Sequence, residues 1–122
     1  MSDKETTLAE LKELMRQFKT ERGWQNSHNP RNLSMSIAIE AAELMEHYQW
    51  DDTDVNEKEV KAELADIITY CLSLADRLNI DISEEVKKKI EHNSRKYPVE
   101  LFNPNKKSRK DYYRIKKEYR KS

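Results

Sequence analysis

Three glutamates recur at intervals of three residues in the segment "IEAAELMEHYQW", residues 39–50. They are Glu40, Glu43 and Glu46, and the segment between and around them is largely apolar. Side chains three residues apart in a helix lie on one face, one turn from each other. Carboxylates are costly to bury unless a partner offsets their charge. On its own, this spacing raises a cation-binding hypothesis that needs a second group of carboxylates to support it.

A second pair with the same spacing, Glu63 and Asp66, follows in "ELADIITY". Two neighbouring antiparallel helices would bring this pair together with Glu40 and Glu43. Four negative charges in a partly desolvated site repel one another, and a divalent cation removes that cost. A ligand set made only of carboxylate oxygens favours Mg²⁺, with Mn²⁺ as a substitute, over zinc. Glu46 is either a further ligand or the base that orients a water.

The alternative is that these residues are surface glutamates of a charge-rich helical protein, in which 38% of residues are charged. The sequence excludes two other kinds of site. A single glycine rules out a P-loop, and a single cysteine rules out a cysteine-based zinc site. Protein-bound Mg²⁺ is commonly shared with substrate phosphates. Any phosphate chemistry here must therefore be built from helices.

The positioning elements are expected to be long helices, because one glycine and three prolines leave few turns. Apolar periodicity and capping residues predict four helices. The first covers residues 6–22, and the second runs from Asn32 or Ser34 to about Trp50. The third covers residues 55–79 after a cap at Asp54, and the fourth runs from about Asp81 to Lys96, before Pro98. With a hydrophobic content of 36%, such a chain fills a modest core alone. Association between chains is therefore expected.

The last seventeen residues, 106–122, form a basic tail with a net charge of +7, and they balance an acidic body. The tail is expected to be solvated, to form a short helix, or to pack on a neighbouring subunit. Binding of nucleic acid is the less favoured interpretation. No apolar run approaches the length of a membrane span, so no membrane partner is expected and a cytoplasmic protein is predicted.

Four segments together resemble the all-α nucleotide pyrophosphohydrolases of the MazG type: "ERGWQNSHNPRNL", "EAAELMEHYQW", "ELADIITY" and "KKKIEHNSRKYP". Within that family they look like the small single-domain branch that includes dCTP pyrophosphatases, over roughly residues 8–105. The resemblance implies an all-α, four-helix bundle-like core over residues 1–105 that assembles as a homodimer or homotetramer. It also implies Mg²⁺-dependent hydrolysis of a (deoxy)nucleoside triphosphate, a pyrimidine one such as dCTP, to the monophosphate and pyrophosphate.

The resemblance also implies roles by position. Glu40, Glu43, Glu63 and Asp66 would hold the metal, and Glu46 would join them as a catalytic residue. The residues assigned to the nucleotide are Trp24, His28, Arg31, Trp50, Tyr70, Lys89, Asn93, Arg95, Lys96 and Tyr97. One departure is Met15, at a position where the dCTP-specific branch can carry a histidine. Methionine cannot replace the hydrogen bonds of histidine, so strict cytosine preference is in doubt.

Several of these roles have structural alternatives. Trp24 and Trp50 flank polar loops and would stack on the base, or they are ordinary packing residues. His28 contacts the base or hydrogen-bonds its own loop, and Arg31 binds phosphate or forms a surface ion pair. Two rival functions also remain: a helical protein that binds nucleotide or metal without hydrolysis, and a nucleic-acid-associated protein that acts through its basic tail.

Overall fold

The regular structure of the chain is helical throughout the residues that the computed structural model describes, which are 1–51, 53–102 and 109–120. The elements are α1 (Leu8–Glu21), α2 (Pro30–Glu46), α3 (Glu57–Arg77), α4 (Ile82–Lys96), α5 (Val99–Phe102) and α6 (Arg109–Arg120). No strand occurs within these described ranges. The predicted all-α class is therefore confirmed.

The chain divides into two compact units, residues 1–82 and residues 83–122. The first unit holds α1, α2 and α3, and the second holds α4, α5 and α6. The predicted domain boundary between residues 105 and 106 falls outside the described residues and stays a prediction.

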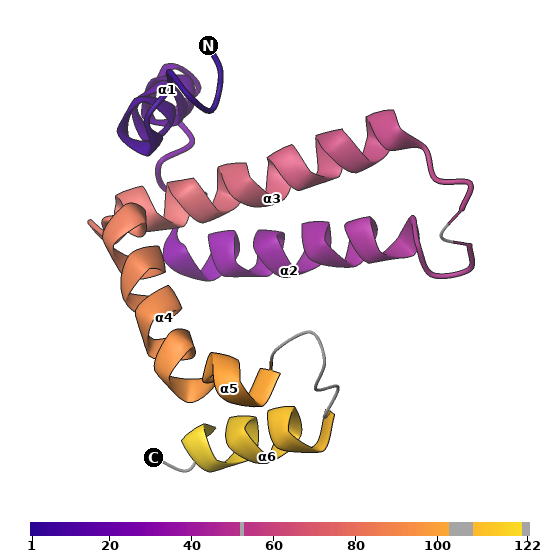
Figure 1. Cartoon of the computed structure of the whole chain (residues 1–122). Coiled ribbons are helices and arrows are strands. Elements are labelled where there is room, and N and C mark those ends of the chain that lie inside the picture. The colour runs from indigo at the N-terminus through magenta and orange to yellow at the C-terminus, as the bar shows by residue number, and fades with distance from the viewer. Residues whose placement is uncertain (52, 103–108, 121–122) are drawn as a thin grey trace. The chain divides into compact units, whose positions relative to one another are not determined.

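In the first unit, α2 and α3 lie side by side and antiparallel, joined by the loop that precedes α3 (Figure 1). The buried side chains Leu33, Leu72 and Ala75 form the small core of this unit. The helix α1 packs on α3 and is tied to its C-terminal end. There the Lys12 ammonium donates to the Ile80 carbonyl at 2.6 Å, across the end of α3.

The first two helices begin at capping residues. Thr7 caps α1, and its hydroxyl accepts from the Glu10 amide at 3.1 Å. The predicted start of α2 at Asn32 or Ser34 is wrong, because the helix begins at Pro30 after an Asn29 cap. The Asn29 side chain accepts from the Asn32 amide at 2.9 Å. Proline fits the first turn, where its missing N–H would have no helical partner.

The connection between α2 and α3 is longer than predicted at both ends. The helix α2 ends at Glu46, four residues before Trp50. The amides of His47 and Tyr48 bond to carbonyls three residues earlier, which tightens and closes the last turn. The predicted cap of α3 at Asp54 is also wrong. Asn56 caps it instead, and its side chain accepts from the Glu59 amide at 3.2 Å.

The second unit is held by aromatic contacts between its helices. The ring of Tyr97 lies 5.5 Å from that of Phe102 and stacks on that of Tyr112 at 5.2 Å. Ile115 on α6 is buried. The predicted end of α4 before Pro98 is confirmed. The helix α6 corresponds to one of the alternatives expected for the tail, and α5 was not predicted. Residues 106–108 and 121–122 of the basic tail lie outside the described residues.

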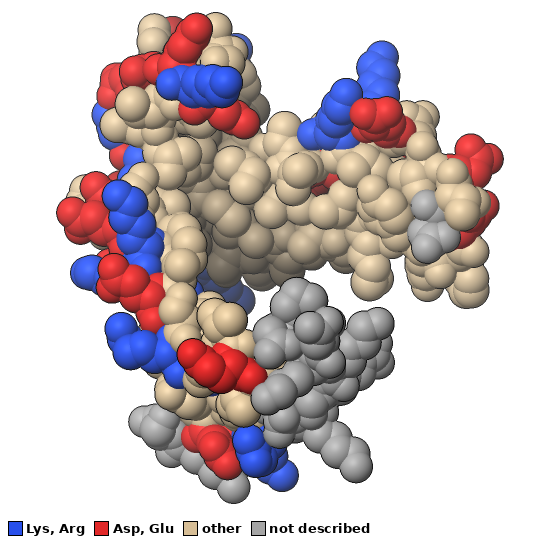
Figure 2. Space-filling model, in the orientation of Figure 1, with Lys and Arg blue, Asp and Glu red and all other residues tan. Residues whose placement is uncertain are grey.

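Much of the surface over α2 and α3 carries neither acidic nor basic side chains (Figure 2). The helices α2 and α3 also expose large apolar side chains, among them Ile39, Met45 and Leu64. None of the helices in the described ranges is both long and apolar enough to span a bilayer.

Candidate active site

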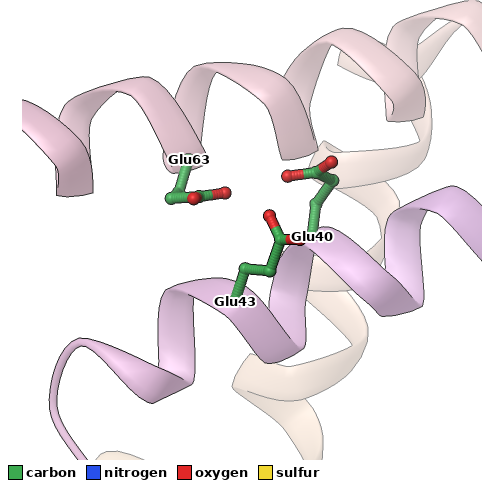
Figure 3. Close-up of side chains that lie close together, drawn as sticks. All are labelled: Glu40, Glu43 and Glu63. Atoms are coloured by element: carbon green, nitrogen blue, oxygen red, sulfur yellow. The ribbon is translucent and has the colours of Figure 1, made fainter.

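Three carboxylates converge between α2 and α3. Glu40 and Glu43 project from α2 and Glu63 projects from α3, and their carboxylates point into the space between the two helices (Figure 3). One oxygen from each residue lies within 4.8 Å of the other two. Asp66 stands three residues after Glu63, near enough for its charge to raise the pKa of Glu40. The two carboxylate pairs expected from the sequence thus come from neighbouring antiparallel helices.

The electrostatics of this cluster favour a bound cation. Hydrogen bonding with Glu63, burial, and the hydrogen bond and charge of Glu43 raise the pKa of Glu40 from its ordinary 4.5 to about 7. Glu40 Oε2 and Glu63 Oε2 are both buried without a hydrogen-bond partner within the described part of the chain. Unpaired buried carboxylate oxygens are costly. The donor set contains only oxygens, which is the chemistry that Mg²⁺ and Mn²⁺ prefer.

A histidine that the sequence reasoning did not select lies against the cluster. His47 Nε2 is 3.8 Å from a Glu63 oxygen, and Nδ1 is 3.7 Å from a Glu59 oxygen. His47 follows Glu43 by four residues, so it lies one turn further along the same face of α2. The four-residue interval between Glu43 and His47 is the sequence feature that could have identified this histidine. The imidazole thus lies beside two carboxylates of α3.

A cavity of about 410 Å³ has one of the four carboxylates, Asp66, in its wall. Its lining comes from three parts of the first unit: Leu14, Met15, Phe18 and Lys19 of α1, Trp24 and His28 of the following loop, and Asp66, Thr69, Tyr70 and Ser73 of α3. The ring of Trp24 stacks on His28 at 5.5 Å and meets Phe18 edge-on at 5.5 Å. The cavity therefore offers aromatic rings to a flat ligand.

Asp66 belongs to both parts of this region. Its charge acts on Glu40 in the cluster, and it also lines the aromatic cavity. A ligand with a flat ring at one end and negative charge at the other would match this arrangement, with its ring in the cavity and its charge toward a bound cation.

The structure brings together some of the predicted site residues in the first unit: Glu40, Glu43, Glu63, Asp66, Trp24, His28 and Tyr70. Met15, the point of departure from the dCTP-specific branch, lines the same cavity. Lys19, Phe18, Thr69 and Ser73 were not predicted.

Other predicted residues lie elsewhere. Trp50 follows α2, is 88% exposed, and does not line the cavity. Arg31 and Glu46 are exposed on α2 and outside the carboxylate cluster. The predicted phosphate and sugar contacts belong to the second unit and stay predictions: Lys89, Asn93, Arg95, Lys96 and Tyr97.

Comparison with known proteins gives the family of the chain. The model of the MazG-like family matches residues 35–112, which include all four carboxylates. The chain belongs to the MazG-like family. The resemblance of its motifs to that family is therefore confirmed.

Curated relatives include dCTP pyrophosphatase 1 of Mus musculus, 34% identical over 106 aligned residues that cover 80% of this chain. The Homo sapiens protein of the same name is 32% identical over the same coverage. The chain spans about 62% of the length of these curated relatives. A solved pyrophosphatase from Archaeoglobus fulgidus is 39% identical, with a TM-score of 0.67, over 80% of this chain and 98% of that one.

Proposed function

We propose that this MazG-like chain is a Mg²⁺-dependent nucleoside triphosphate pyrophosphohydrolase that sanitises the nucleotide pool. Its substrate would be a (deoxy)nucleoside triphosphate, a pyrimidine one such as dCTP, and its products the monophosphate and pyrophosphate. The observation that carries this proposal is the position of Asp66, which joins the carboxylate cluster to the aromatic cavity. The names of the curated relatives support the same reaction.

The carboxylates Glu40, Glu43, Glu63 and Asp66 would hold Mg²⁺ or Mn²⁺. When bound, such an ion neutralises phosphate charge and lowers the pKa of a coordinated water. His47, one turn beyond Glu43 on the same face of α2, would help to orient Glu63. Glu46, or one of the four carboxylates, would accept the proton of the attacking water. Lys89 and Arg95 would offset charge on the phosphates.

The aromatic cavity would take the base. Trp24 and His28 form a stacked wall, and the ring of Tyr70 lies 6.3 Å from that of His28. Stacking on an aromatic ring is worth about 1–3 kcal/mol per base. The cavity volume of about 410 Å³ suits one nucleoside. Trp50 would add a further wall once the nucleotide is bound.

We also propose that the chain works as a homodimer or homotetramer in the cytoplasm. Exposed apolar side chains support association: Met35, Ile39 and Met45 on α2, and Leu64 and Ile68 on α3, are each 47–60% exposed. A groove of about 830 Å³ between α1 and α3 is lined by Leu11, Leu14, Leu64, Ile68 and Leu72, among others. Surfaces of this kind mark protein contacts.

The test is a panel of ribo- and deoxynucleoside triphosphates incubated with the protein and Mg²⁺, with pyrophosphate as the measured product. We expect release with at least one pyrimidine nucleotide, dependence on Mg²⁺ or Mn²⁺, and a loss of at least about 100-fold in kcat for Glu43→Gln. A folded, metal-loaded protein that turns over none of the panel would refute the proposal. Light scattering coupled to gel filtration gives the number of subunits.

A further inference from the structure

Lys19 is a lysine that the fold buries at the wall of the aromatic cavity. It lies on α1 beside Phe18, lines the cavity, and is only 8% exposed. Lysines are rarely buried this far unless they are paired. Because Lys19 is part of the cavity wall, a ligand in the cavity that carries a hydrogen-bond acceptor would meet this side chain.

No ion pair to Lys19 is found among the residues that the structure describes. Asp76 is near enough to raise the pKa of Lys19, but the Asp76 carboxylate is already bound by Arg16, whose Nε donates to Oδ2 at 3.1 Å. Burial outweighs this effect and lowers the pKa of Lys19. An ammonium group carries three donors and no acceptor, so donors remain for a ligand.

The charge of Lys19 is felt inside the cavity. It lowers the pKa of His28, after the larger effect of burial, and His28 stacks on Trp24 in the cavity wall. His28 Nδ1 is itself buried without a hydrogen-bond partner in the described part of the chain. The aromatic cavity thus has a polar edge made of a cationic donor and an unpaired ring nitrogen.

We propose that Lys19 is a specificity-determining residue that donates a hydrogen bond to a carbonyl oxygen of the nucleobase. This inference rests on the proposed function, since it assumes that the cavity takes the base of a nucleotide. A donor-only group selects acceptors: cytosine, uracil, thymine and guanine carry a carbonyl oxygen, and adenine carries none. The rival interpretations are that Lys19 binds a phosphate or acts only on stability beside Asp76.

The experiment measures binding by isothermal titration calorimetry with Mg²⁺ present. The ligands are non-hydrolysable α,β-imido analogues of dCTP, dUTP and dATP, together with inorganic triphosphate, which has no base. The wild type is compared with Lys19→Met, which removes the donors, and with Lys19→Arg, which keeps them. We expect Lys19→Met to weaken binding of the dCTP and dUTP analogues by about 10–100-fold, as for a lost hydrogen bond to a charged group. Its effect on the dATP analogue and on triphosphate should stay below about 3-fold, and Lys19→Arg should recover most of the loss.

Lys12→Met is the matched control, because Lys12 is a half-buried lysine of the same helix that bonds to the Ile80 carbonyl outside the cavity. It should lower the melting temperature and leave the order of nucleotide affinities unchanged. An equal loss for all four ligands with Lys19→Met, no loss for any, or no nucleotide binding by the wild type would each overturn the inference. A wild type that binds the analogues but releases no pyrophosphate from dCTP would refute only the proposed function, and the binding ratios would still decide the role of Lys19.

Discussion

Glu40 and Glu63 face each other across the interface of α2 and α3, and each has one buried carboxylate oxygen without a hydrogen-bond partner in the described residues. Their proximity is the largest cause of the raised pKa of Glu40. Two carboxylates held this way destabilise each other when both are ionised. A cation between the helices would relieve that repulsion, so the cluster should respond to both pH and metal.

The pH response of the metal-free protein follows from Glu40. Its pKa is raised from 4.5 to about 7 in the folded state, so the folded state binds the proton more tightly than the unfolded chain. The contribution of Glu40 to the free energy of unfolding is fully present below pH 4.5 and is lost as the pH rises through 7. Urea unfolding midpoints measured in EDTA should therefore fall between about pH 5 and pH 8.

Glu40→Gln should flatten this dependence, because the variant has no proton to lose at that position. Glu46→Gln is the matched control, since it removes one acidic charge from the same helix outside the cluster. An unchanged slope in Glu40→Gln would show that another group causes it.

Metal binding should stabilise the protein through the same carboxylates. At a free Mg²⁺ or Mn²⁺ concentration of 100 times Kd, the folded state gains about 2.7 kcal/mol, which is measurable as a rise of several degrees in Tm. Glu43→Gln and Glu63→Gln should lose most of this rise, because each removes one charged ligand. Glu57→Gln, at the exposed start of α3, should keep it. Equal metal-dependent shifts in all four proteins would contradict the assignment of the cluster.

The two tryptophans should contribute unequally to nucleotide binding. Trp24 lines the cavity, and Trp50 is 88% exposed outside it. Trp24→Ala should raise KM by about 5–100-fold through lost stacking, and Trp24→Phe should retain most of the affinity. Trp50→Ala measured beside them tests the predicted second wall: a comparable rise in KM would mean that Trp50 closes on the bound base.

The pair formed by Arg16 and Asp76 should hold α1 against α3 and leave the chemistry unchanged. Arg16 lowers the pKa of Asp76 below its ordinary 3.8, so the contribution of the pair is complete above pH 3.8 and is lost as pH falls below it. Asp76→Asn should lower Tm by a few degrees at pH 7 and have a smaller effect near pH 3. Glu13→Gln, which alters only the exposed partner of Arg16 on α1, serves as the control. A Tm loss for Asp76→Asn that does not shrink in acid would point to packing instead.

The sequence was sufficient to predict the four long helices and the carboxylate pairs, because both depend on periodicity within one element. Glu40 and Glu43 share a helix face whatever α2 packs against. Contacts that depend on the register between helices were missed. His47 reaches Glu59 and Glu63 across the α2–α3 interface, and Lys19 reaches the cavity only because α1 packs on the second half of α3.

Helix starts were misplaced where several capping residues stand close together. Asn29 and Asn32 are both good caps, as are Asp54 and Asn56, and local propensity does not separate them. In the structure, Asn29 caps α2 and Asn56 caps α3. For α2, this choice places Pro30 in the first turn, where proline is tolerated.

The most direct test of the central claim is ³¹P NMR of dCTP incubated with the protein and Mg²⁺, beside Glu40→Gln and a sample in EDTA. We predict that the wild type converts dCTP to dCMP and pyrophosphate, and that the variant and the EDTA sample show little or no conversion. Release of inorganic phosphate with dCDP, or equal conversion by wild type and Glu40→Gln, would contradict a pyrophosphohydrolase built on the α2–α3 carboxylates.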